Sequence, residues 1–287
     1  MDFLQPSSWD DALAARAERP DALPIAGGTD VMVELNFDRR RPGALLDLTR
    51  VPELAGWSVA PDGTVRLGAG VSYGRVIGEL GDRLPGLAMA ARTVGSPQIR
   101  VRGTVGGNLG SASPAGDAHP PLLAARAEVE VASVARGTRR VPVADFFTGV
   151  KRNALAPDEL IAAVHVPTAA GPQQFCKIGT RNAMVISVSA FALALHPDRR
   201  AVGTGIGSAA PTPRRAPDAE EFLAGELDWD RRPALPEGLA RAFGERVAAA
   251  ASPIDDVRGT AAYRRHSLAV LARRAATWAW DDLRRAA

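Results

Sequence analysis

Glycines and hydroxyl side chains are concentrated in one segment, TVGGNLGSASPAGD, which runs from Thr104 to Asp117. Gly106 and Gly107 lack the Cβ atoms that would keep a phosphate oxygen away from backbone N–H groups, and glycine easily takes the positive φ angles that turn successive N–H groups toward one anion. We therefore expect this segment to be a single loop that binds a pyrophosphate with sugars attached.

Neutral donors and one carboxylate follow the two glycines. Asn108, Ser111 and Ser113 offer hydrogen bonds to phosphate or sugar oxygens. Asp117 is placed to accept from ribityl or ribose hydroxyls, as acidic residues do in other dinucleotide folds. A plainer role stays open for each feature, because a glycine pair also serves tight turns and Asp117 could cap a helix that begins near Pro120.

A second glycine pair strengthens the prediction of an anion site. Residues 24–31, PIAGGTDV, are expected to form a buried strand, a sharp turn at Gly27 and Gly28, and a helix that begins near Thr29. Turn glycines ahead of a helix N-terminus commonly hold anions. Two such segments, each with hydroxyl side chains nearby, favour a ligand over two unrelated turns.

Gly68, Gly70 and Gly74 have the glycine spacing of a nucleotide-binding Rossmann loop, but we expect them to form a structural turn. The strand before them is most simply the second arm of a hairpin with residues 57–60, which is the wrong partner for a βαβ unit. The acidic residue that such a loop needs about 20 residues later falls in an apolar helix and its end.

The pattern of apolar residues and turns predicts the elements that position these segments. In the first part of the chain the predicted strands are residues 23–26, 44–48, 57–60, 65–67, 128–133, 139–143 and 160–166, with helices after Ser8 and Ser72 and from Pro85. Residues 168–172, TAAGP, are the best linker, so we divide the chain into a domain of residues 1–170 and a second of residues 172–287. Beyond the linker we expect an antiparallel meander followed by helices, the last of them long.

Composition excludes several classes of protein. Of the 287 residues 46% are apolar, which is ample for a packed core. The sequence pI is near 9.6, yet the formal net charge is only +3 and no basic block has interleaved aromatics, so we expect no nucleic-acid partner. We also expect no membrane span and a cytoplasmic location, because no apolar run is long enough and the acidic N-terminus lacks a secretory core.

The chain holds a single cysteine, Cys176, and only two lysines, Lys151 and Lys177. One cysteine forms neither an intramolecular disulfide nor an iron–sulfur site, so we expect a buried thiol. The four histidines are far apart, and neither a Walker loop nor a hydrolase serine elbow is present. Since few acid–base groups cluster, we expect a cofactor to perform the chemistry, and we assign no catalytic or metal-binding side chain.

Taken in order, the segments resemble a known family: the FAD-binding medium subunits of the molybdenum hydroxylases, which include xanthine dehydrogenase and carbon monoxide dehydrogenase. The matching pieces are AGGTD at residues 26–30, GSPQIRVRGTVGGN at 95–108, ASPAGD at 112–117, FFTG at 146–149, DELI at 158–161, KIGTRNA at 177–183 and RGTAAYRRHSLAVLARRA at 258–275. The resemblance spans nearly the whole chain, and the ordered series of motifs is specific.

The resemblance implies an α+β fold. Its N-terminal part is an FAD-binding domain of two subdomains, of the vanillyl-alcohol-oxidase (PCMH) type, and its C-terminal domain has a three-stranded antiparallel sheet with helices. The residues that the resemblance implies for FAD binding are Pro24, Ile25, Ala26, Gly27, Gly28, Thr29, Asp30, Val31, Thr104, Val105, Gly106, Gly107, Asn108, Ser113, Asp117, Ile161 and Lys177.

By the same resemblance, residues 24–31 and 104–108 hold the pyrophosphate and Asp117 binds ribityl or ribose hydroxyls. Ile161 packs against the flavin or adenine end. Lys177 lies beside the isoalloxazine ring, where a cation favours the anionic reduced flavin. Many relatives have an acidic residue near the flavin edge where this chain has Val185, so the electron acceptor stays open.

The implied function is electron transfer: electrons from substrate hydroxylation at molybdenum pass through [2Fe–2S] clusters to FAD, and on to NAD, oxygen or another acceptor. Two clusters need roughly eight cysteine ligands, so an iron–sulfur small subunit and a molybdopterin large subunit are expected as partners. Purine or xanthine is the first candidate substrate of the whole enzyme, with carbon monoxide, nicotinate and aldehydes open. The rivals are a stand-alone flavin oxidoreductase of the same fold and a non-catalytic nucleotide-binding module.

Overall fold

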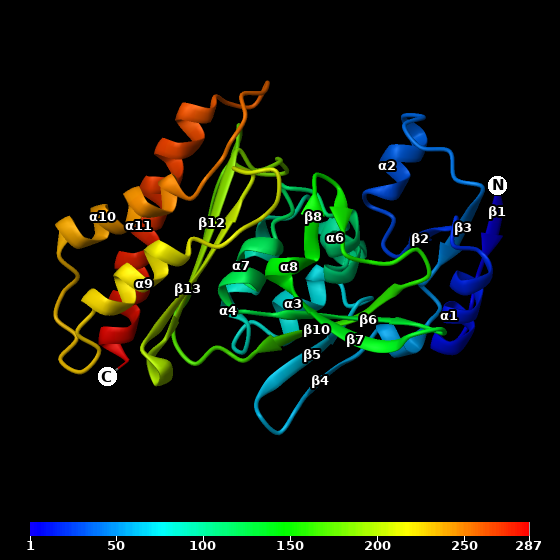
Figure 1. Ribbon diagram of the computed structural model, residues 1–287, viewed down its shortest axis with the longest axis horizontal. Coiled ribbons are helices and arrows are strands. Elements are labelled where there is room, and N and C mark those ends of the chain that lie inside the picture. Colours follow the sequence, from blue (N-terminus) through cyan, green and yellow to red (C-terminus); the bar gives the residue numbers. More distant parts are fainter. Residues whose placement is uncertain (287) are drawn as a thin grey trace.

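Three β-sheets of three or more strands follow one another along the molecule, with helices packed between and around them (Figure 1). The computed structural model describes residues 1–286. The first half of the chain forms two sheets with their helices, and the second half forms one more sheet with its helices. This is the α+β architecture that the resemblance predicts, and the prediction is confirmed.

The first sheet is small and parallel. Its strands are β1 (Asp2–Leu4), β3 (Ala44–Asp47) and β2 (Leu23–Ile25), in that order across the sheet. Helix α1 (Trp9–Glu18) connects β1 to β2, and its N-cap is Ser8, whose hydroxyl accepts a hydrogen bond from the N–H of Asp11 as the sequence predicts. Helix α2 (Val31–Asn36) follows β2 after the glycine turn.

The second sheet is antiparallel and has five strands. In spatial order they are β4 (Trp57–Val59), β5 (Thr64–Gly68), β10 (Leu160–Pro167), β6 (Glu128–Ser133) and β7 (Gly137–Pro142). Because β5 pairs antiparallel with both neighbours, the glycines after it do not belong to a βαβ unit, and the predicted structural turn is confirmed. A Cβ on Gly68 would lie 2.4 Å from the Leu54 carbonyl oxygen, so this glycine serves close packing.

Short helices lie over one face of the second sheet (Figure 1). They are α3 (Tyr73–Glu79), α4 (Pro85–Thr93), α5 (Pro97–Arg102), α6 (Val105–Ser111), α7 (His119–Ala124) and α8 (Val143–Phe146), and α8 leads into the hairpin of β8 (Phe147–Gly149) and β9 (Arg152–Asn153). The prediction that residues 104–117 form a single loop is wrong, because α6 occupies half of that segment. Thr104 starts this helix, its Oγ1 accepting from the Gly107 N–H at 2.9 Å.

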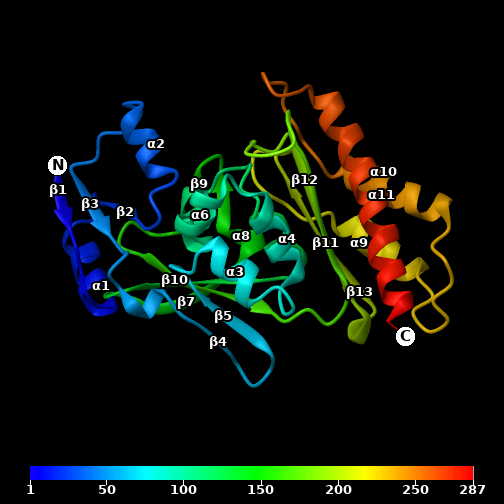
Figure 2. The ribbon, with the colours of Figure 1, turned by 180° about the vertical axis from the view of Figure 1, so that it is seen from behind.

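The C-terminal part contains the predicted antiparallel meander, β11 (Gln173–Ile178), β12 (Ser189–His196) and β13 (Ala201–Gly207). Helices α9 (Pro217–Glu226), α10 (Glu237–Ala249) and α11 (Ala261–Arg285) cover one face of its sheet, and α4 and α7 of the first part cover the other (Figures 1 and 2). Since both faces are covered, every residue of β12 is buried.

The chain builds separate apolar cores before and after the linker. The larger core takes residues from Ala12 to Val166, and the second takes residues from Cys176 to Leu283. The predicted division at residues 170–172 lies between them, in the segment that joins β10 to β11. The separation of the cores supports this division, which stays our proposal for the domain boundary.

Two glycines let β13 lie directly against α7. A Cβ on Gly205 would be 2.0 Å from the Pro120 carbonyl oxygen, and one on Gly203 would be 2.0 Å from that of Ala124. At these two positions the two parts of the chain therefore meet backbone against backbone, without intervening side chains.

Cys176 is buried at the second core, so the prediction of a buried thiol is confirmed, and burial raises the pKa of this thiol to about 11. Among residues 1–286, no helix has the length and apolar character needed to cross a membrane.

An alanine in the contact between β13 and α7 and an alanine at an open helix position are expected to change the free energy of unfolding in opposite directions. Gly205→Ala is expected to lower the free energy of unfolding by roughly 1–3 kcal/mol, the usual cost of overpacking. Gly225→Ala in α9, where an added Cβ meets nothing within 4 Å, is expected to raise it by about 0.5–1 kcal/mol. Urea unfolding measures both, and equal effects would contradict the close packing.

Candidate functional site

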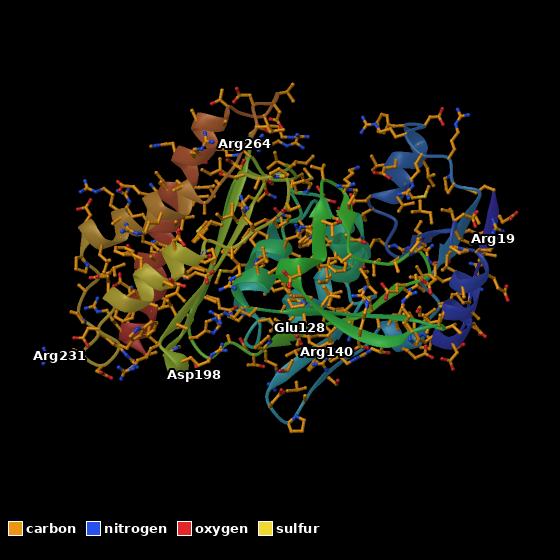
Figure 3. The ribbon with its side chains drawn as sticks, in the orientation of Figure 1. Arg19, Glu128, Arg140, Asp198, Arg231 and Arg264 are labelled. Carbon is orange, nitrogen blue, oxygen red and sulfur yellow. The ribbon has the colours of Figure 1, made fainter. Side chains whose placement is uncertain are left out.

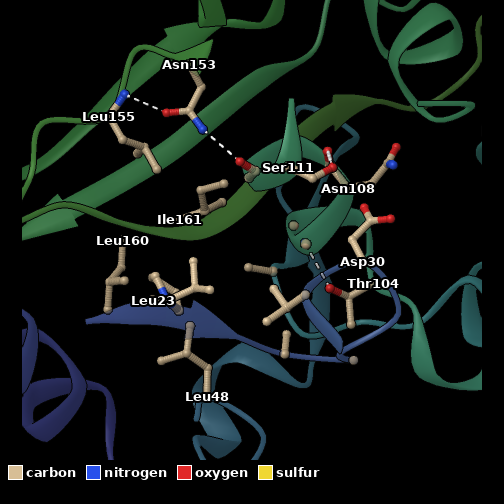
Figure 4. A pocket seen from close by; sticks show the side chains of 18 of the residues that line it. Leu23, Asp30, Leu48, Thr104, Asn108, Ser111, Asn153, Leu155, Leu160 and Ile161 are labelled. Carbon is tan, nitrogen blue, oxygen red and sulfur yellow. Dashed lines mark hydrogen bonds between the residues drawn. The ribbon is translucent and has the colours of Figure 1, made fainter. Parts of the chain in front are cut away.

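A cavity of about 800 Å³ opens between the first sheet and the helices over the second (Figure 4). Its walls come mainly from four stretches of chain, residues 23–34, 69–73, 103–111 and 148–161. Both glycine segments predicted from the sequence therefore border one space.

The turn between β2 and α2 presents backbone donors to this cavity. The N–H groups of Gly27, Gly28, Thr29, Asp30 and Val31 donate no hydrogen bond to any residue within 1–286. Gly28 has a φ of +75°, the left-handed conformation that glycine takes without strain. Consecutive unbonded N–H groups on such a turn form the concave donor surface that binds anions elsewhere in proteins.

The glycine pair at residues 106 and 107 serves a different purpose from the predicted one. The first N–H groups of α6 are already bonded: Gly106 donates to the Ala69 carbonyl at 3.2 Å, and Gly107 to Thr104 Oγ1. A Cβ on Gly106 would lie 2.5 Å from that of Ala69. Gly106 thus allows α6 to pack against the turn after β5. Both glycines line the cavity, Gly106 as a buried residue and Gly107 as an exposed one.

Two polar atoms in the cavity wall have no partner among the described residues. They are the hydroxyl of Tyr73 and the side-chain oxygen of Asn108, both buried. Burial, with the nearby carboxylates of Asp117 and Asp30, holds the pKa of the Tyr73 hydroxyl well above its usual value, so it stays a protonated donor. A buried polar group without a hydrogen bond is costly, which is a reason to expect a ligand there.

Charged side chains surround the opening of the cavity. Lys151, in the β8–β9 turn, pairs with Glu34 of α2 at 2.5 Å, and Arg40 approaches the same carboxylate at 3.7 Å. Arg16 of α1 also lines the cavity, where burial lowers the pKa of its guanidinium. The ion pair of Lys151 therefore connects the two walls, although this lysine was not among the predicted binding residues.

The cavity fits FAD in its donors and its apolar surface. Free N–H groups and the two unbonded polar atoms lie on its walls, as a pyrophosphate and sugar hydroxyls require. Apolar side chains that suit a ring system line it as well; they belong to Leu23, Leu48, Leu54, Leu155, Leu160 and Ile161 (Figure 4).

Asp117 and Lys177 do not line this cavity but bind each other beside it. Lys177 Nζ lies 2.6 Å from Asp117 Oδ2, and Ser187 Oγ donates to Asp117 Oδ1 at 2.6 Å. Thr93 Oγ1 donates to the same carboxylate at 3.3 Å. Burial raises the pKa of Asp117, while the Lys177 ammonium and the hydroxyl donors oppose that rise. The open alternative that Asp117 caps α7 is wrong, because the N-cap position is Ala118.

A second cavity, of about 200 Å³, adjoins the first: Val94 lines the larger space and Gly95 the smaller. Arg92, Arg100, Lys177 and Arg181 line it, together with Val185, and no carboxylate does so. Within the described residues, none of the three arginines pairs with a carboxylate. Arg100, on α5, instead donates to the carbonyls of residues 92, 94 and 95, and Arg181 to those of residues 183 and 184. The smaller cavity therefore carries uncompensated positive charge.

Twelve of the predicted residues line the large cavity: Pro24, Ala26, Gly27, Gly28, Thr29, Asp30, Val31, Thr104, Gly106, Gly107, Asn108 and Ile161. Ile25, Val105, Ser113 and Asp117 line neither cavity, and Lys177 lines the smaller one. The Ser113 hydroxyl accepts from the Ala115 N–H in a turn.

Tyr73, Asn153 and Ser187 were missed by the sequence analysis. Tyr73 follows the glycine turn that was interpreted as purely structural, so its position beside that turn was the available signal. Asn153, whose side-chain amide donates to the Gly110 carbonyl at 3.0 Å, lies between the FFTG and DELI motifs. Ser187 reaches Asp117 only through the fold and gave no signal in the sequence.

Comparison with known protein families finds two matches. Residues 1–169 match the FAD binding domain in molybdopterin dehydrogenase, and residues 174–279 match the CO dehydrogenase flavoprotein C-terminal domain.

Similar curated proteins cover most of the chain. A putative xanthine dehydrogenase FAD-binding subunit of Escherichia coli is 34% identical over 74% of this chain and 75% of its own length. The nicotine 6-hydroxylase medium subunit of Paenarthrobacter nicotinovorans is 33% identical over 95% of this chain and 94% of its own. Among solved structures, carbon monoxide dehydrogenase from Hydrogenophaga pseudoflava matches with a TM-score of 0.89 at 27% identity, covering 99% of this chain and 98% of that one.

The buried ion pair of Lys177 and Asp117 predicts a measurable coupling between the effects of their substitutions on the free energy of unfolding. Lys177→Met leaves the Asp117 carboxylate without its cation and is expected to lower the free energy of unfolding by about 3–5 kcal/mol. Adding Asp117→Asn should recover part of this loss, because an amide needs no counter-charge. Urea unfolding of both single variants and the double variant measures the coupling, and strictly additive losses would contradict it.

Proposed function

This chain belongs to the family of FAD-binding subunits of the molybdopterin dehydrogenases, and from that membership we propose that it transfers electrons between iron–sulfur clusters on a partner subunit and NAD or another acceptor. The observation that carries the proposal is the row of five unbonded N–H groups, residues 27–31, beside an apolar-walled cavity.

Within this proposal, the chain's residues bind FAD in distinct ways. The N–H groups of residues 27–31 bind the pyrophosphate, and Ile161 packs against a ring of the cofactor. Asn108 offers its unbonded oxygen to a sugar hydroxyl. The roles of Asp117 with the ribityl or ribose hydroxyls, and of Lys177 beside the isoalloxazine ring, stay proposals. Lys177 borders the smaller cavity and its Nζ lies 2.6 Å from Asp117 Oδ2, whereas Asp117 itself lines neither cavity.

Bound FAD accepts electrons singly and releases them as a pair, which is the chemistry that joins iron–sulfur clusters to a two-electron acceptor. The chain's single cysteine leaves the [2Fe–2S] clusters and the molybdopterin to an iron–sulfur small subunit and a molybdopterin large subunit. A cytoplasmic location remains a proposal consistent with an unpaired cysteine.

The substrate of the whole enzyme is set by the molybdopterin subunit in this proposal. Purine or xanthine is our candidate, since a relative 34% identical to this chain is named as a xanthine dehydrogenase subunit. Other relatives are named for nicotinate, nicotine and carbon monoxide, at 30–33% identity. Sequence similarity of the FAD-binding chain therefore distinguishes only weakly among candidate substrates of the whole enzyme.

The acceptor that we favour is NAD. Its pyrophosphate is an anion, and three arginines without carboxylate partners surround the smaller cavity. Val185, an uncharged residue, also lines this cavity. A cationic wall without a carboxylate attracts a phosphate-bearing acceptor more strongly than a neutral quinone.

The FAD content of the purified chain tests the proposal directly. We expect heat to release one FAD per chain, identified by its absorption spectrum and by chromatography. Failure to bind added FAD would contradict the proposal and leave a non-catalytic nucleotide-binding module. Rapid turnover of an organic substrate by the isolated flavoprotein would instead favour a stand-alone oxidoreductase.

The choice of NAD predicts an effect of Arg92, whose side chain makes no hydrogen bond or ion pair with the described residues. NADH should bleach the flavin of the isolated chain. Arg92→Gln should raise the NADH concentration for half-maximal bleaching rate roughly threefold or more, with the saturated rate unchanged.

Arg231→Gln is the matched control, since Arg231 lies at the outer edge of the C-terminal part, in the loop between α9 and α10 (Figure 3). It should leave the NADH dependence unaltered. No bleaching by NADH in the wild type would contradict NAD as the acceptor, and an unchanged NADH dependence in the Arg92 variant would exclude the smaller cavity from its binding.

A further inference from the structure

The ring of Tyr73 is packed in the interior, whereas its buried hydroxyl lacks a hydrogen-bond partner among the described residues. It is the first residue of α3, and its N–H donates to the Gly103 carbonyl at 3.0 Å. Only 3% of the residue is exposed. Its hydroxyl has no hydrogen-bond partner among residues 1–286. Phenylalanine would fill the same space without leaving a buried polar atom unsatisfied.

The Tyr73 ring packs close to the turn of residues 27–31, which has the free N–H groups. A Cβ built on Gly103 would meet the Thr29 hydroxyl at 3.4 Å and the Tyr73 ring at 3.5 Å, so these two side chains pack around the same glycine. Tyr73 also lines the larger cavity together with the turn. Tyr73 therefore borders the same space as the unbonded N–H groups of residues 27–31, with its buried hydroxyl left for a ligand to satisfy.

The charges nearby decide the direction of the hydrogen bond. Burial, together with the carboxylates of Asp117 and Asp30, raises the pKa of the Tyr73 hydroxyl and disfavours its ionisation. A protonated phenol among N–H donors lacks an acceptor, and an anionic phosphate oxygen supplies one. A sugar hydroxyl would also accept, but it is neutral and forms a weaker bond than a phosphate oxygen does.

We propose that the Tyr73 hydroxyl donates a hydrogen bond to a pyrophosphate oxygen of FAD, and that Tyr73 is therefore a cofactor-binding side chain supplementing the backbone donors of residues 27–31. The inference rests on the proposed binding of FAD in this cavity. It assigns a ligand contact to a turn whose glycines the sequence analysis interpreted as structural.

Tyr73→Phe tests the proposal, because it removes one oxygen and keeps the ring. Titration of the flavin-free protein with FAD, followed by flavin fluorescence, should show a dissociation constant raised roughly 10- to 100-fold, as for loss of a hydrogen bond to a charged group. The flavin-free variant should unfold at an equal or higher urea concentration than the wild type, because its buried hydroxyl is unsatisfied until the cofactor binds. A purely structural role for the hydroxyl would not combine these two effects.

Tyr263→Phe is the matched control, since Tyr263 is the other tyrosine of the chain and is 47% exposed on α11. It should change neither the FAD affinity nor the urea midpoint. ADP, which has a diphosphate but no ribityl chain, serves as a second probe. Tyr73→Phe should weaken ADP binding by the same factor as FAD binding.

An FAD dissociation constant within about twofold of the wild type in Tyr73→Phe would overturn the inference. Weaker FAD binding with unchanged ADP binding would also overturn it, because the contact would then be made to the ribityl chain. A wild-type protein that binds no FAD would refute the proposed function itself, which separates that failure from failure of the Tyr73 assignment.

Discussion

The backbone contact between Gly27 and Arg102 is the constraint on which the cavity depends. A Cβ on Gly27 would lie 1.9 Å from the Arg102 carbonyl oxygen, a distance that no side chain permits. The contact presses the turn after β2, which belongs to the first sheet, against the end of α5, one of the helices that lie over the second sheet. The following N–H groups then border the cavity without a protein acceptor. The glycine is therefore needed less for ligand access than for bringing two backbones together.

A second set of close contacts joins the two halves of the chain. Asp117, between α6 and α7, pairs with Lys177 on β11, while Gly203 and Gly205 let β13 lie against α7. The smaller cavity takes Arg92 and Arg100 from the first half of the chain, and Lys177 and Arg181 from the second. Its positive charge is thus a property of the docked halves, and neither half contains the cavity by itself.

The sequence predicts those features that depend on neighbours along the chain. The hairpins, the C-terminal meander and the turn at residues 27–28 follow from local patterns of apolar residues and glycine. The helix α6 was missed because Thr104 caps it and tertiary contacts absorb its first N–H groups, which outweighs two glycines of low helix propensity. The partners of Asp117 were also missed, since Ser187 lies 70 residues away and meets it only through the fold. Individual residues were recognisable from motifs, but the pairs that they form were not.

A site built largely from backbone groups accounts for the pattern of similarity among relatives. The unbonded donors of residues 27–31 are N–H groups, which any side-chain sequence supplies once the glycines allow the turn. Such a site tolerates divergence elsewhere, and relatives named for nicotine and for carbon monoxide are still 33% and 30% identical to this chain over nearly its full length. The smaller cavity is lined by long charged side chains instead, with Val185 among them. Substitution of Arg92, whose side chain makes no hydrogen bond or ion pair with the described residues, would change its charge without disturbing a backbone contact. Under the proposed function, a change of electron acceptor is therefore expected to arise at the smaller cavity, while the packing of the glycine turn is expected to retain FAD binding.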